Sequence, residues 1–389
     1  MTKHLTVGLL AGEASGDNLG AGLMRQVKAR LPADYEVEFI GIGGDRMLAD
    51  GLRELASIHD LSVNGFKDPI IKLPSLLRTL RNVGDQIIAE EVDAFIGIDF
   101  NVFNFLLEGR LRRAGIRTAH YVSPSVYAWR RGRTKRVAKV ADMIFCLYPF
   151  EPPFYEGMTV EPVFVGHPMA DEISLEDGSD EARNVAQSQL TVPQGKTIIA
   201  VLPGSRGSEV DLMLPTFLAA MRLILASRPE SHFLIPAPHQ RLYDKVSAQL
   251  TSDLPVQLVL GGARTVLQAA DVALVKSGTS TLEAMLLRRP MVVSYRLGAL
   301  TYQLVKRLLR TPFVALPNIL LGREKVPELL QDQGTPEALA KALLTELEKA
   351  QRDQHYFDEF EALHKELRRD ANATAARAVL RLCGLGDTT

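Results

Sequence analysis

Short apolar segments alternate with longer amphipathic segments along most of the chain. The apolar segments read HLTVGLL, VEFIGIG, AFIGID, TAHYVS and MIFCLY in the first half, and TIIAVLPG, HFLIPA, VQLVLG, VALVKSG and MVVSY in the second. They are continuously apolar rather than alternating, which is typical of parallel strands covered by helices on both faces. The pattern therefore predicts an α/β protein with two successive domains, each built from βαβ units around a parallel sheet.

A polar, acidic stretch without a strand pattern, DEISLEDGSDEARNVAQSQLTVPQGK, separates the two halves. We expect a first domain over residues 1–175 and a second over 190–350, because 389 residues exceed one ordinary core. From residue 336 the pattern is helical and contains no strand. Residues 351–389 are expected to form C-terminal helices that pack back on the first domain or on a partner, which leaves a homo-oligomer open.

Composition excludes several classes of protein. The formal net charge of −1 gives no indication of a nucleic-acid binder. The two cysteines, Cys146 and Cys383, lie in apolar segments, which argues against a disulfide framework and fits a reducing compartment. The N-terminal apolar run is too short for a signal peptide, and no apolar stretch approaches the ~18 residues of a spanning helix. We expect a cytoplasmic protein that is soluble or lies on a membrane surface.

Ligands of open α/β sheets bind beyond the carboxyl ends of the strands, so the loops there are the candidate sites. The first loop, GEASGD, lacks the G-x-G-x-x-G fingerprint, and its Glu13 would repel a pyrophosphate. Glu13, Ser15 and Asp17 could instead hold hydroxyl groups. The simpler alternative is a strand-to-helix turn in which Ser15 or Asp17 is the N-cap.

Asp99 directly follows the apolar segment AFIGI. A carboxylate at the end of a buried strand is partly desolvated, which suits a general base. The alternative, equally compatible with the sequence, is an N-cap for a helix that begins near Asn101.

Two loops of the second half are suited to anions. LPGSRGSEV offers Ser205, Arg206 and the amides of neighbouring glycines. In VKSGTSTLEAM, Ser277, Gly278 and Thr279 form a turn before a helix expected to start at Thr281, and such an N-terminus suits a diphosphate.

Three further polar residues stand near these loops. Glu283 could accept hydrogen bonds from a ribose, although a capping box with Ser280 is the simpler explanation. The segment LPNILLGRE brings together Asn318, Arg323 and Glu324.

Residues 64–81, NGFKDPIIKLPSLLRTLR, combine basic and apolar positions, with Pro74 suited to the first turn of a helix. Such a segment can lie in a membrane interface or contact an acyl chain, or it can be an ordinary core-facing helix. A second basic cluster, WRRGRTKRVAK at 129–139, is a solvated helix face or a contact for phosphates. The apolar positions of the first segment are Ile70, Ile71, Leu73, Leu76, Leu77 and Leu80.

Taken together, these loops resemble the lipid-A-disaccharide synthase family of bacterial glycosyltransferases. AGEASGD, GIGGDRM, FIGID, HYVSPSVYAWR, PFE, GHPMAD, LPGSRGSEV, SGTSTLEAML and LPNILLGRE occur in the family's order and at similar spacing over nearly the whole chain. Each motif is weak by itself, but nine in order make a chance resemblance improbable.

The resemblance implies a GT-B fold, in which two Rossmann-like domains face a cleft. It implies transfer of 2,3-diacylglucosamine from its UDP ester to 2,3-diacylglucosamine 1-phosphate (lipid X), with inversion at the anomeric carbon and release of UDP. It also implies no cofactor and no metal, in keeping with the absence of a compact His/Cys/Asp cluster from the sequence. Its lipid substrates favour peripheral placement at the inner leaflet of the inner membrane, and an acyl or membrane contact for residues 64–81.

By motif, the resemblance makes Asp99 the general base, with Glu13 as its rival. The first domain would bind the acceptor through Glu13, Ser15 and Asp17. The second would bind the donor, and the residues implied there are Ser205, Arg206, Ser277, Gly278, Thr279, Glu283, Asn318 and Arg323.

The chain departs from the family pattern at two places. The family usually has a proline and a second aspartate between GID and Phe-Asn, where this chain reads Phe100-Asn101-Val102. Tyr127 stands where the family has tryptophan. The alternatives are a related GT-B enzyme with another acceptor, a UDP-sugar 2-epimerase, and a two-lobed binding protein; an epimerase would not need the apolar segment.

Overall fold

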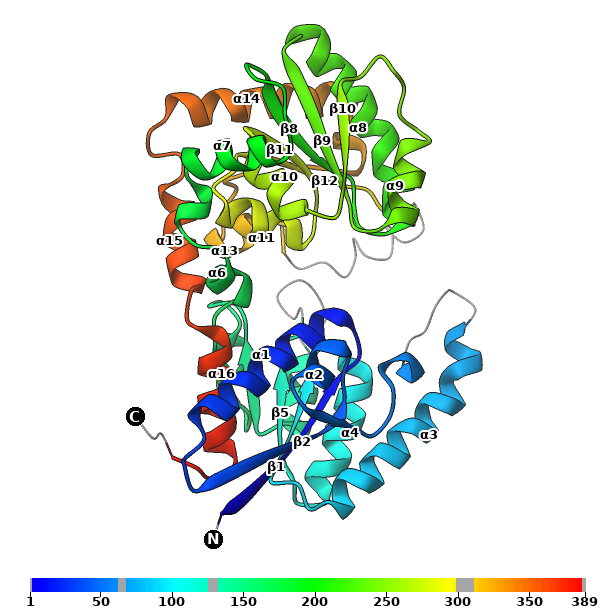
Figure 1. Ribbon diagram of the computed structural model, residues 1–389, viewed down its shortest axis with the longest axis vertical. Coiled ribbons are helices and arrows are strands. Elements are labelled where there is room, and N and C mark those ends of the chain that lie inside the picture. Colours follow the sequence, from blue (N-terminus) through cyan, green and yellow to red (C-terminus); the bar gives the residue numbers. More distant parts are fainter. Residues whose placement is uncertain (1, 62–67, 125–131, 299–310, 387–389) are drawn as a thin grey trace. The chain divides into compact units, whose positions relative to one another are not determined.

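The structure, a computed structural model, describes residues 2–61, 68–124, 132–298 and 311–386 (Figure 1). The chain forms two compact units. The first comprises Met1–Asp171 together with Leu367–Thr389, and the second comprises Glu172–Glu366. The second unit is therefore inserted in the sequence of the first.

The first unit is built on a seven-stranded sheet of order β3-β2-β1-β4-β5-β6-β7, in which every described pair is parallel. Its strands are β1 (Lys3–Ala11), β2 (Tyr35–Ile42), β3 (Leu52–Glu54), β4 (Ala94–Ile98), β5 (Arg117–Tyr121), β6 (Met143–Cys146) and β7 (Glu161–Phe164). Its helices are α1 (Ala14–Arg30), α2 (Asp45–Ala49), α3 (Asp68–Ala89), α4 (Asn101–Arg113), α5 (Arg133–Val140) and α16 (Ala371–Leu382). The chain leaves the first unit within α6 (Pro168–Glu172).

The second unit has a six-stranded parallel sheet of order β10-β9-β8-β11-β12-β13. Its strands are β8 (Thr197–Leu202), β9 (Ser231–Ala237), β10 (Val256–Leu260), β11 (Val272–Lys276), β12 (Met291–Tyr295) and β13 (Glu328–Leu330). Its helices are α7 (Asp180–Gln189), α8 (Gly207–Ser227), α9 (Gln240–Ser247), α10 (Ala263–Ala269), α11 (Thr279–Leu286), α13 (Leu316–Leu321), α14 (Pro336–Arg352) and α15 (Asp358–Leu367).

All ten apolar segments of the sequence form strands, so the predicted α/β class with two parallel sheets is confirmed. Three strands were not predicted: β3, β7 and β13. All three lie at the edges of the sheets, span only three or four residues and are partly exposed. An edge strand needs no continuous apolar run, because one side of it has no neighbouring strand to cover it.

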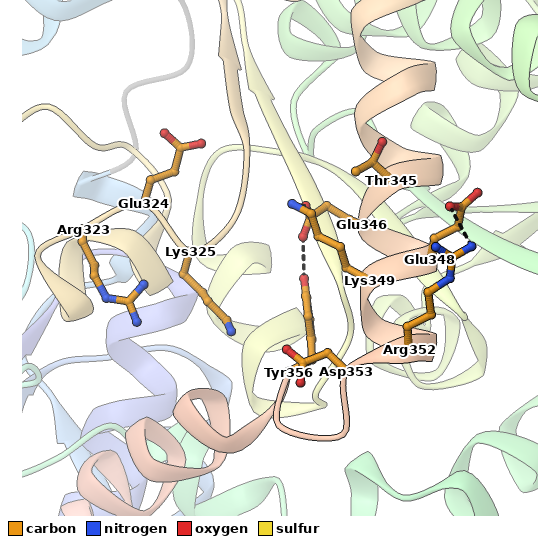
Figure 2. Close-up of a pocket in the computed structure, with 10 residues that line it drawn as sticks. All are labelled: Arg323, Glu324, Lys325, Thr345, Glu346, Glu348, Lys349, Arg352, Asp353 and Tyr356. Atoms are coloured by element: carbon orange, nitrogen blue, oxygen red, sulfur yellow. Dashed lines mark hydrogen bonds and ion pairs between the residues drawn. The ribbon is translucent and has the colours of Figure 1, made fainter.

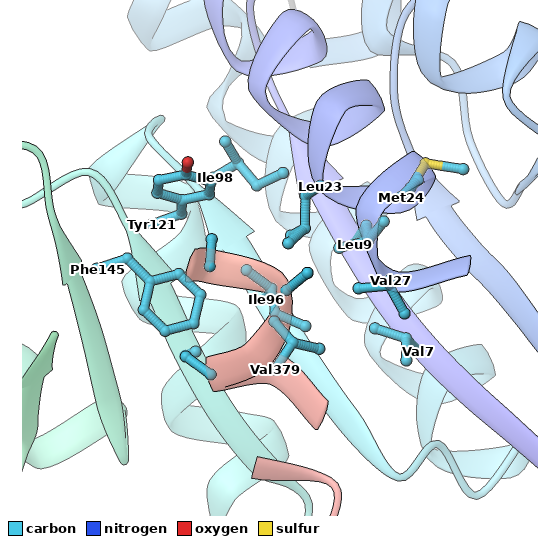
Figure 3. Close-up of a cluster of buried hydrophobic side chains, with 14 of the residues drawn as sticks. Val7, Leu9, Leu23, Met24, Val27, Ile96, Ile98, Tyr121, Phe145 and Val379 are labelled. Atoms are coloured by element: carbon cyan, nitrogen blue, oxygen red, sulfur yellow. The ribbon is translucent and has the colours of Figure 1, made fainter. Parts of the chain in front are cut away.

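The core of the first unit joins segments from both ends of the chain. Val7 and Leu9 of β1 and Ile96 of β4 pack against α1 and against Val379 of α16, and all are buried (Figure 3). The carboxylate of Asp171 accepts the amides of Asp370 and Ala371 at 2.9 and 2.6 Å, which fixes the start of α16. The C-terminal helix α16 is thus an integral part of the first unit.

Two helices have features that bear on membranes. α3 begins at Asp68, so Pro74 lies inside this helix and the expectation that it occupies the first turn is wrong. Among the described residues, α8 has the length and apolarity of a membrane span, but its Leu214, Phe217 and Met221 are buried in the core of the second unit. We therefore assign α8 to that core.

His167, in the motif GHP, lies shortly before the chain passes from the first unit to the second. It contacts the segment at Leu367, where the chain returns to the first unit. The backbone N–H of His167 donates to the Leu367 carbonyl at 2.9 Å, and its ring atom Nδ1 accepts a hydrogen bond from the Met169 amide at 3.2 Å. Burial lowers the pKa of His167 to about 4. Folding therefore holds this imidazole in its neutral form.

We predict that His167 makes the protein less stable in mild acid. Between pH 6.5 and pH 4 the unfolded chain binds a proton that the folded chain does not, so stability falls as pH decreases through that window. His167→Asn keeps an acceptor for Met169 but does not titrate. Between pH 7 and pH 5 the free energy of unfolding of the wild type should fall by about 2 kcal/mol more than that of the variant. Parallel urea-unfolding curves would contradict this role.

Candidate active site

In each sheet the strand order reverses at one point, and the candidate loops leave the sheet there. In the first unit β1 and β4 are neighbours, with Ala11 opposite Ile98, and in the second unit β8 and β11 are neighbours. The segments that follow two such strands run to opposite faces of the sheet and leave a crevice between them. A pocket lies at each of these switch points.

In the first unit, two pockets meet at the switch point. One has a volume of about 430 Å³ and is lined by Glu13, Asp99, Asn101, Arg133 and apolar side chains such as Phe100. The other has a volume of about 720 Å³ and also includes Glu13 and Phe100, together with polar residues after β1 and β2. Glu13 and Asp99 therefore lie at one site, in a pocket whose other lining residues are mostly apolar, with Asn101 and Arg133 as further polar members.

Asp99 and Phe100 both adopt left-handed backbone conformations, with φ of +48° and +43°. The Asp99 amide donates to the Tyr121 carbonyl at 2.8 Å, and Asn101 Nδ2 donates to Asp99 Oδ1 at 3.2 Å. The N-cap of α4 is Phe100, without a side-chain cap, so the alternative interpretation of Asp99 as an N-cap is wrong. Asp99 is half-buried and is one of the residues that line the smaller pocket.

Asp17 stabilises the start of another helix, which could not be predicted from the sequence. Its buried carboxylate accepts the amides of Gly44, Arg46 and Met47 at 2.8, 3.1 and 3.0 Å, so it caps α2 rather than its own helix. The N-cap of α1 is Glu13, which corrects the alternative in which Ser15 or Asp17 has that position. Glu13 and Ser15 are exposed, and Glu13, unlike Ser15, lines both of the pockets described above.

Most of the side chains that line the smaller pocket are apolar. α3 contributes Leu76, Leu77 and Leu80, and α4 contributes Val102 and Leu106. Leu76 and Leu80 also pack against the core, whereas Leu77, Val102 and Leu106 are 47%, 68% and 43% exposed. The predicted apolar segment therefore has both a core-facing and an exposed side. Ile70, Ile71 and Leu73 belong to α3, but their side chains lie outside the described ones.

In the second unit, a pocket of about 600 Å³ brings two loops together. The loop after β8 supplies Ser205 and Arg206, and the loop after β11 supplies Ser277, Gly278 and Thr279 at the N-terminus of α11. α11 starts two residues earlier than predicted. Hydroxyl groups, a guanidinium and a helix N-terminus in one pocket form a site that favours an anion.

Glu209 and Lys276 line the same pocket and were not predicted. Glu209 accepts the Ser205 amide at 3.0 Å and the Arg206 amide at 3.3 Å, while Lys276 Nζ donates to its other oxygen at 3.0 Å. Although burial acts to raise it, the pKa of Glu209 is lowered by Lys276 and these amides. The pair joins the two loops. The only sequence signal was the position of Glu209 three residues after Arg206, as in a capping box.

Three predicted donor residues do not line this pocket. Glu283 accepts from Arg264 Nε at 3.2 Å rather than closing a capping box with Ser280, and burial raises its pKa. Arg323 pairs with Glu359 and lies in a different pocket of about 590 Å³, beside Lys325 and the buried Glu346 (Figure 2).

Asn318 is buried and uses its whole carboxamide within the protein. Nδ2 donates to the Val326 carbonyl at 2.9 Å and to Glu328 Oε1 at 2.8 Å, and Oδ1 accepts the amides of Lys325 and Val326 at 2.7 and 2.9 Å. With all four hydrogen bonds made, the amide holds the loop that follows α13. Within the described part of the chain, no group of three His, Cys, Asp or Glu side chains is arranged to hold a metal ion.

Solved structures with the same arrangement define the class of fold. The UDP-GlcNAc 2-epimerase from Neisseria meningitidis matches with a TM-score of 0.60 at 12% identity, covering 98% of this chain and 99% of that one. The calicheamicin glycosyltransferase CalG4 matches with a TM-score of 0.59 at 15% identity, covering 99% of each chain. At these identities the likeness concerns the fold. The two parallel sheets and these neighbours define a GT-B architecture.

Sequence comparison identifies the family. The family model described as lipid-A-disaccharide synthetase matches residues 7–379. The lipid-A-disaccharide synthase of Azotobacter vinelandii is 46% identical over 386 residues, which cover 98% of this chain and 99% of that protein. That of Saccharophagus degradans is 44% identical over 98% of this chain and 97% of its own length. The chain belongs to the lipid-A-disaccharide synthase family and is a glycosyltransferase of lipid A biosynthesis.

Proposed function

We propose that the enzyme condenses UDP-2,3-diacylglucosamine with 2,3-diacylglucosamine 1-phosphate (lipid X), forming a β-1,6-linked disaccharide 1-phosphate and UDP. The observation that carries this proposal is the pocket in which Asp99 and Glu13 border the apolar side chains of α3 and α4. A carboxylate beside an apolar wall suits a hydroxyl nucleophile carried by a lipid. A UDP-sugar 2-epimerase, whose substrate has no acyl chain, would have no use for that wall.

Asp99 is the proposed general base. As the acceptor 6-hydroxyl oxygen attacks the anomeric carbon, Asp99 takes its proton, and the bond from that carbon to the UDP phosphate oxygen breaks with its electron pair leaving on UDP. Attack opposite the leaving group inverts the anomeric configuration. Glu13 is exposed and has no side-chain cap interaction, so we propose that it orients acceptor hydroxyls, with Ser15 near it at the start of α1.

The second unit is the proposed donor site. Arg206, Lys276 and the N-terminus of α11 would compensate the charge that develops on the diphosphate as the glycosidic bond breaks, an electrostatic contribution of the oxyanion-hole type. Ser205, Ser277 and Thr279 supply hydroxyl groups at the same pocket. Glu283 is kept as the ribose ligand that the resemblance implies, although it lies outside this pocket and is paired with Arg264. The four internal hydrogen bonds of Asn318 favour a supporting role for this residue over direct contact with the donor.

We propose peripheral placement at the cytoplasmic face of the inner membrane. The exposed side chains Leu77, Val102 and Leu106 support it, because apolar groups on this surface can reach acyl chains. α5 packs beside α4 and presents the exposed cations Lys135, Arg136 and Lys139. Anionic headgroups would complement this charge.

Asp99→Asn is expected to reduce kcat at least about a hundredfold while the affinity for UDP stays unchanged, because only the proton acceptor is removed. The assay combines both diacylglucosamine substrates and detects the disaccharide by mass spectrometry. Disaccharide formation at the wild-type rate would exclude Asp99 as base and transfer the role to Glu13. No disaccharide from the folded wild type would contradict the proposed substrates.

Arg206→Ala is expected to weaken UDP binding about tenfold, since one charge-assisted contact to the diphosphate is lost. Titration calorimetry measures this with the lipids absent. Arg323→Ala is the matched control: its guanidinium lies in another pocket, so UDP affinity should change by less than about twofold. Equal losses in both variants would support the sequence-based expectation that Arg323 contacts the donor.

The exposed apolar side chains should act on the acceptor. The triple variant Leu77→Ser, Val102→Ser, Leu106→Ser should raise the KM for lipid X about tenfold in detergent micelles, where docking to a bilayer has no influence. The control replaces exposed apolar residues of the second unit, Leu212, Leu223 and Leu260.

Sedimentation with anionic vesicles separates the two contacts. A loss of vesicle binding with unchanged KM would assign this surface to the membrane rather than to an acyl chain. No change in either measurement would exclude both contacts.

A further inference from the structure

A column of buried polar side chains stands directly behind Asp99. It consists of Asn104 and Glu108, one turn apart on the inner face of α4, and His120 on the neighbouring strand β5. None of the three has any exposed surface, and none lines either pocket of the first unit. These residues cannot contact a substrate, so their effect on the reaction must pass through the residues that do.

Asn104 holds the turn that carries the carboxylate. Its Nδ2 donates to the Asp99 carbonyl at 2.8 Å and lies 3.3 Å from the Ile98 carbonyl and 3.4 Å from the Leu10 carbonyl. The amide group thus ties the end of β4 to the end of β1. The contact with the Asp99 carbonyl is the shortest of the three, and Asp99 is one of the two residues here with a left-handed backbone.

Two consecutive non-glycine residues in the left-handed region are costly, so something must hold them there. Asp99 and Phe100 have this conformation, and the Phe100 ring fills the space over Gly12, where any side chain on the glycine would overlap it. The ring anchors the turn on its outer side. Asn104 is the polar anchor on its inner side.

Glu108 and His120 form the part of the column that lies farther from Asp99. Glu108 Oε1 and His120 Nδ1 are 2.7 Å apart, and the Glu108 and Asn104 side chains both cover Gly97 of β4, where a Cβ would overlap them. Burial raises the pKa of Glu108, although His120 counteracts it. Glu108 therefore lies next to Asn104 over β4, with His120 as its own partner.

The column lowers the stability of the fold, if it is regarded only as a structural element. Asn104 Oδ1, Glu108 Oε2 and His120 Nε2 are buried and have no hydrogen-bond partner within the described part of the chain. A buried polar group without a partner destabilises a fold, and apolar side chains of similar size would fill the same space without that cost. The donor function of the Asn104 amide is the property that apolar packing could not replace.

We propose that Asn104 is a positioning residue for the reaction: it locks the left-handed Asp99–Phe100 turn so that the Asp99 carboxylate faces the acceptor. The Glu108–His120 pair holds Asn104 in place. This inference rests on the proposed role of Asp99 as the general base. It predicts that Asn104 acts through Asp99 and through no other catalytic group.

A double-mutant cycle tests that dependence. Asn104→Ala should lower kcat at least about tenfold, with the KM for both substrates and the affinity for UDP changed by less than about threefold. In the Asp99→Asn background the same substitution should change kcat by less than about threefold, because the group that it positions is already absent. If Asn104→Ala lowered kcat by the same factor in the Asp99→Asn background as in the wild type, the inference would be overturned.

Stability is controlled separately. Asn372→Ala makes the same substitution on α16 of the same unit, where the amide packs against Gly22 of α1, and it should leave kcat unchanged. Asn104→Ser retains one donor in a small side chain and should keep more activity than Asn104→Ala at equal thermal stability. Equal kcat for the Ser and Ala variants would show that volume, not hydrogen bonding, matters at this position, and would overturn the inference.

The outcomes separate the two proposals. If Asp99→Asn retains wild-type turnover, the proposed base is wrong and the positioning inference falls with it. If Asp99→Asn is inactive but Asn104→Ala turns over normally, the proposed function stands and only the positioning inference is overturned.

Discussion

Three loops of this protein depend on one interaction: a buried or half-buried carboxylate that accepts backbone amides. Asp17 receives three amides from the chain after β2, Glu209 receives two from the loop after β8, and Glu328 receives those of Val314 and Ala315. A tight loop at the end of a parallel strand leaves amides that no strand or helix can pair. An ionised acceptor satisfies several of them at once and more strongly than a neutral one. Of the candidate site residues, Arg206 stands on a loop fixed in this way, since its own amide is one of those that Glu209 accepts.

The same interaction explains which parts of the site the sequence could predict. The ten apolar strands, their parallel arrangement and the chemically distinct loops at their ends follow from patterns of a few consecutive residues. Arg206 and Ser277 were each identified as anion-binding candidates from their loops and were joined in one site by the family resemblance; the structure places them in one pocket because β8 and β11 are neighbours. Asp17 resembled a ligand-binding acid because its partners, Gly44, Arg46 and Met47, come from another loop. The hydrogen bonds of Asn318 to the segment after α13 could not be predicted from the sequence either, and Lys276 was overlooked as the last residue of a strand.

The two units use the same topology for different chemistry. At the first switch point the loops bring carboxylates next to apolar side chains, and at the second they bring cations and hydroxyl groups next to a helix N-terminus. The strand order is the same around both points, so the difference comes from the loop residues rather than from the sheets. Two departures from the family pattern, Asn101 and Val102, fall on the surface of the first switch point: Asn101 donates to the Asp99 carboxylate and Val102 extends the apolar wall.

The path of the chain also determines the order in which the protein can be made. Val379 and its neighbours on α16 complete the core formed by β1, β4 and α1, yet α16 is translated after the whole second unit. During synthesis the second unit has all of its residues available first, and the nascent first unit must wait with an uncovered apolar face on α1 and its sheet. The ribosome therefore releases a chain whose earliest-made domain is the last to close, and a premature stop before α16 would leave that domain, rather than the second, as a target for chaperones and proteases.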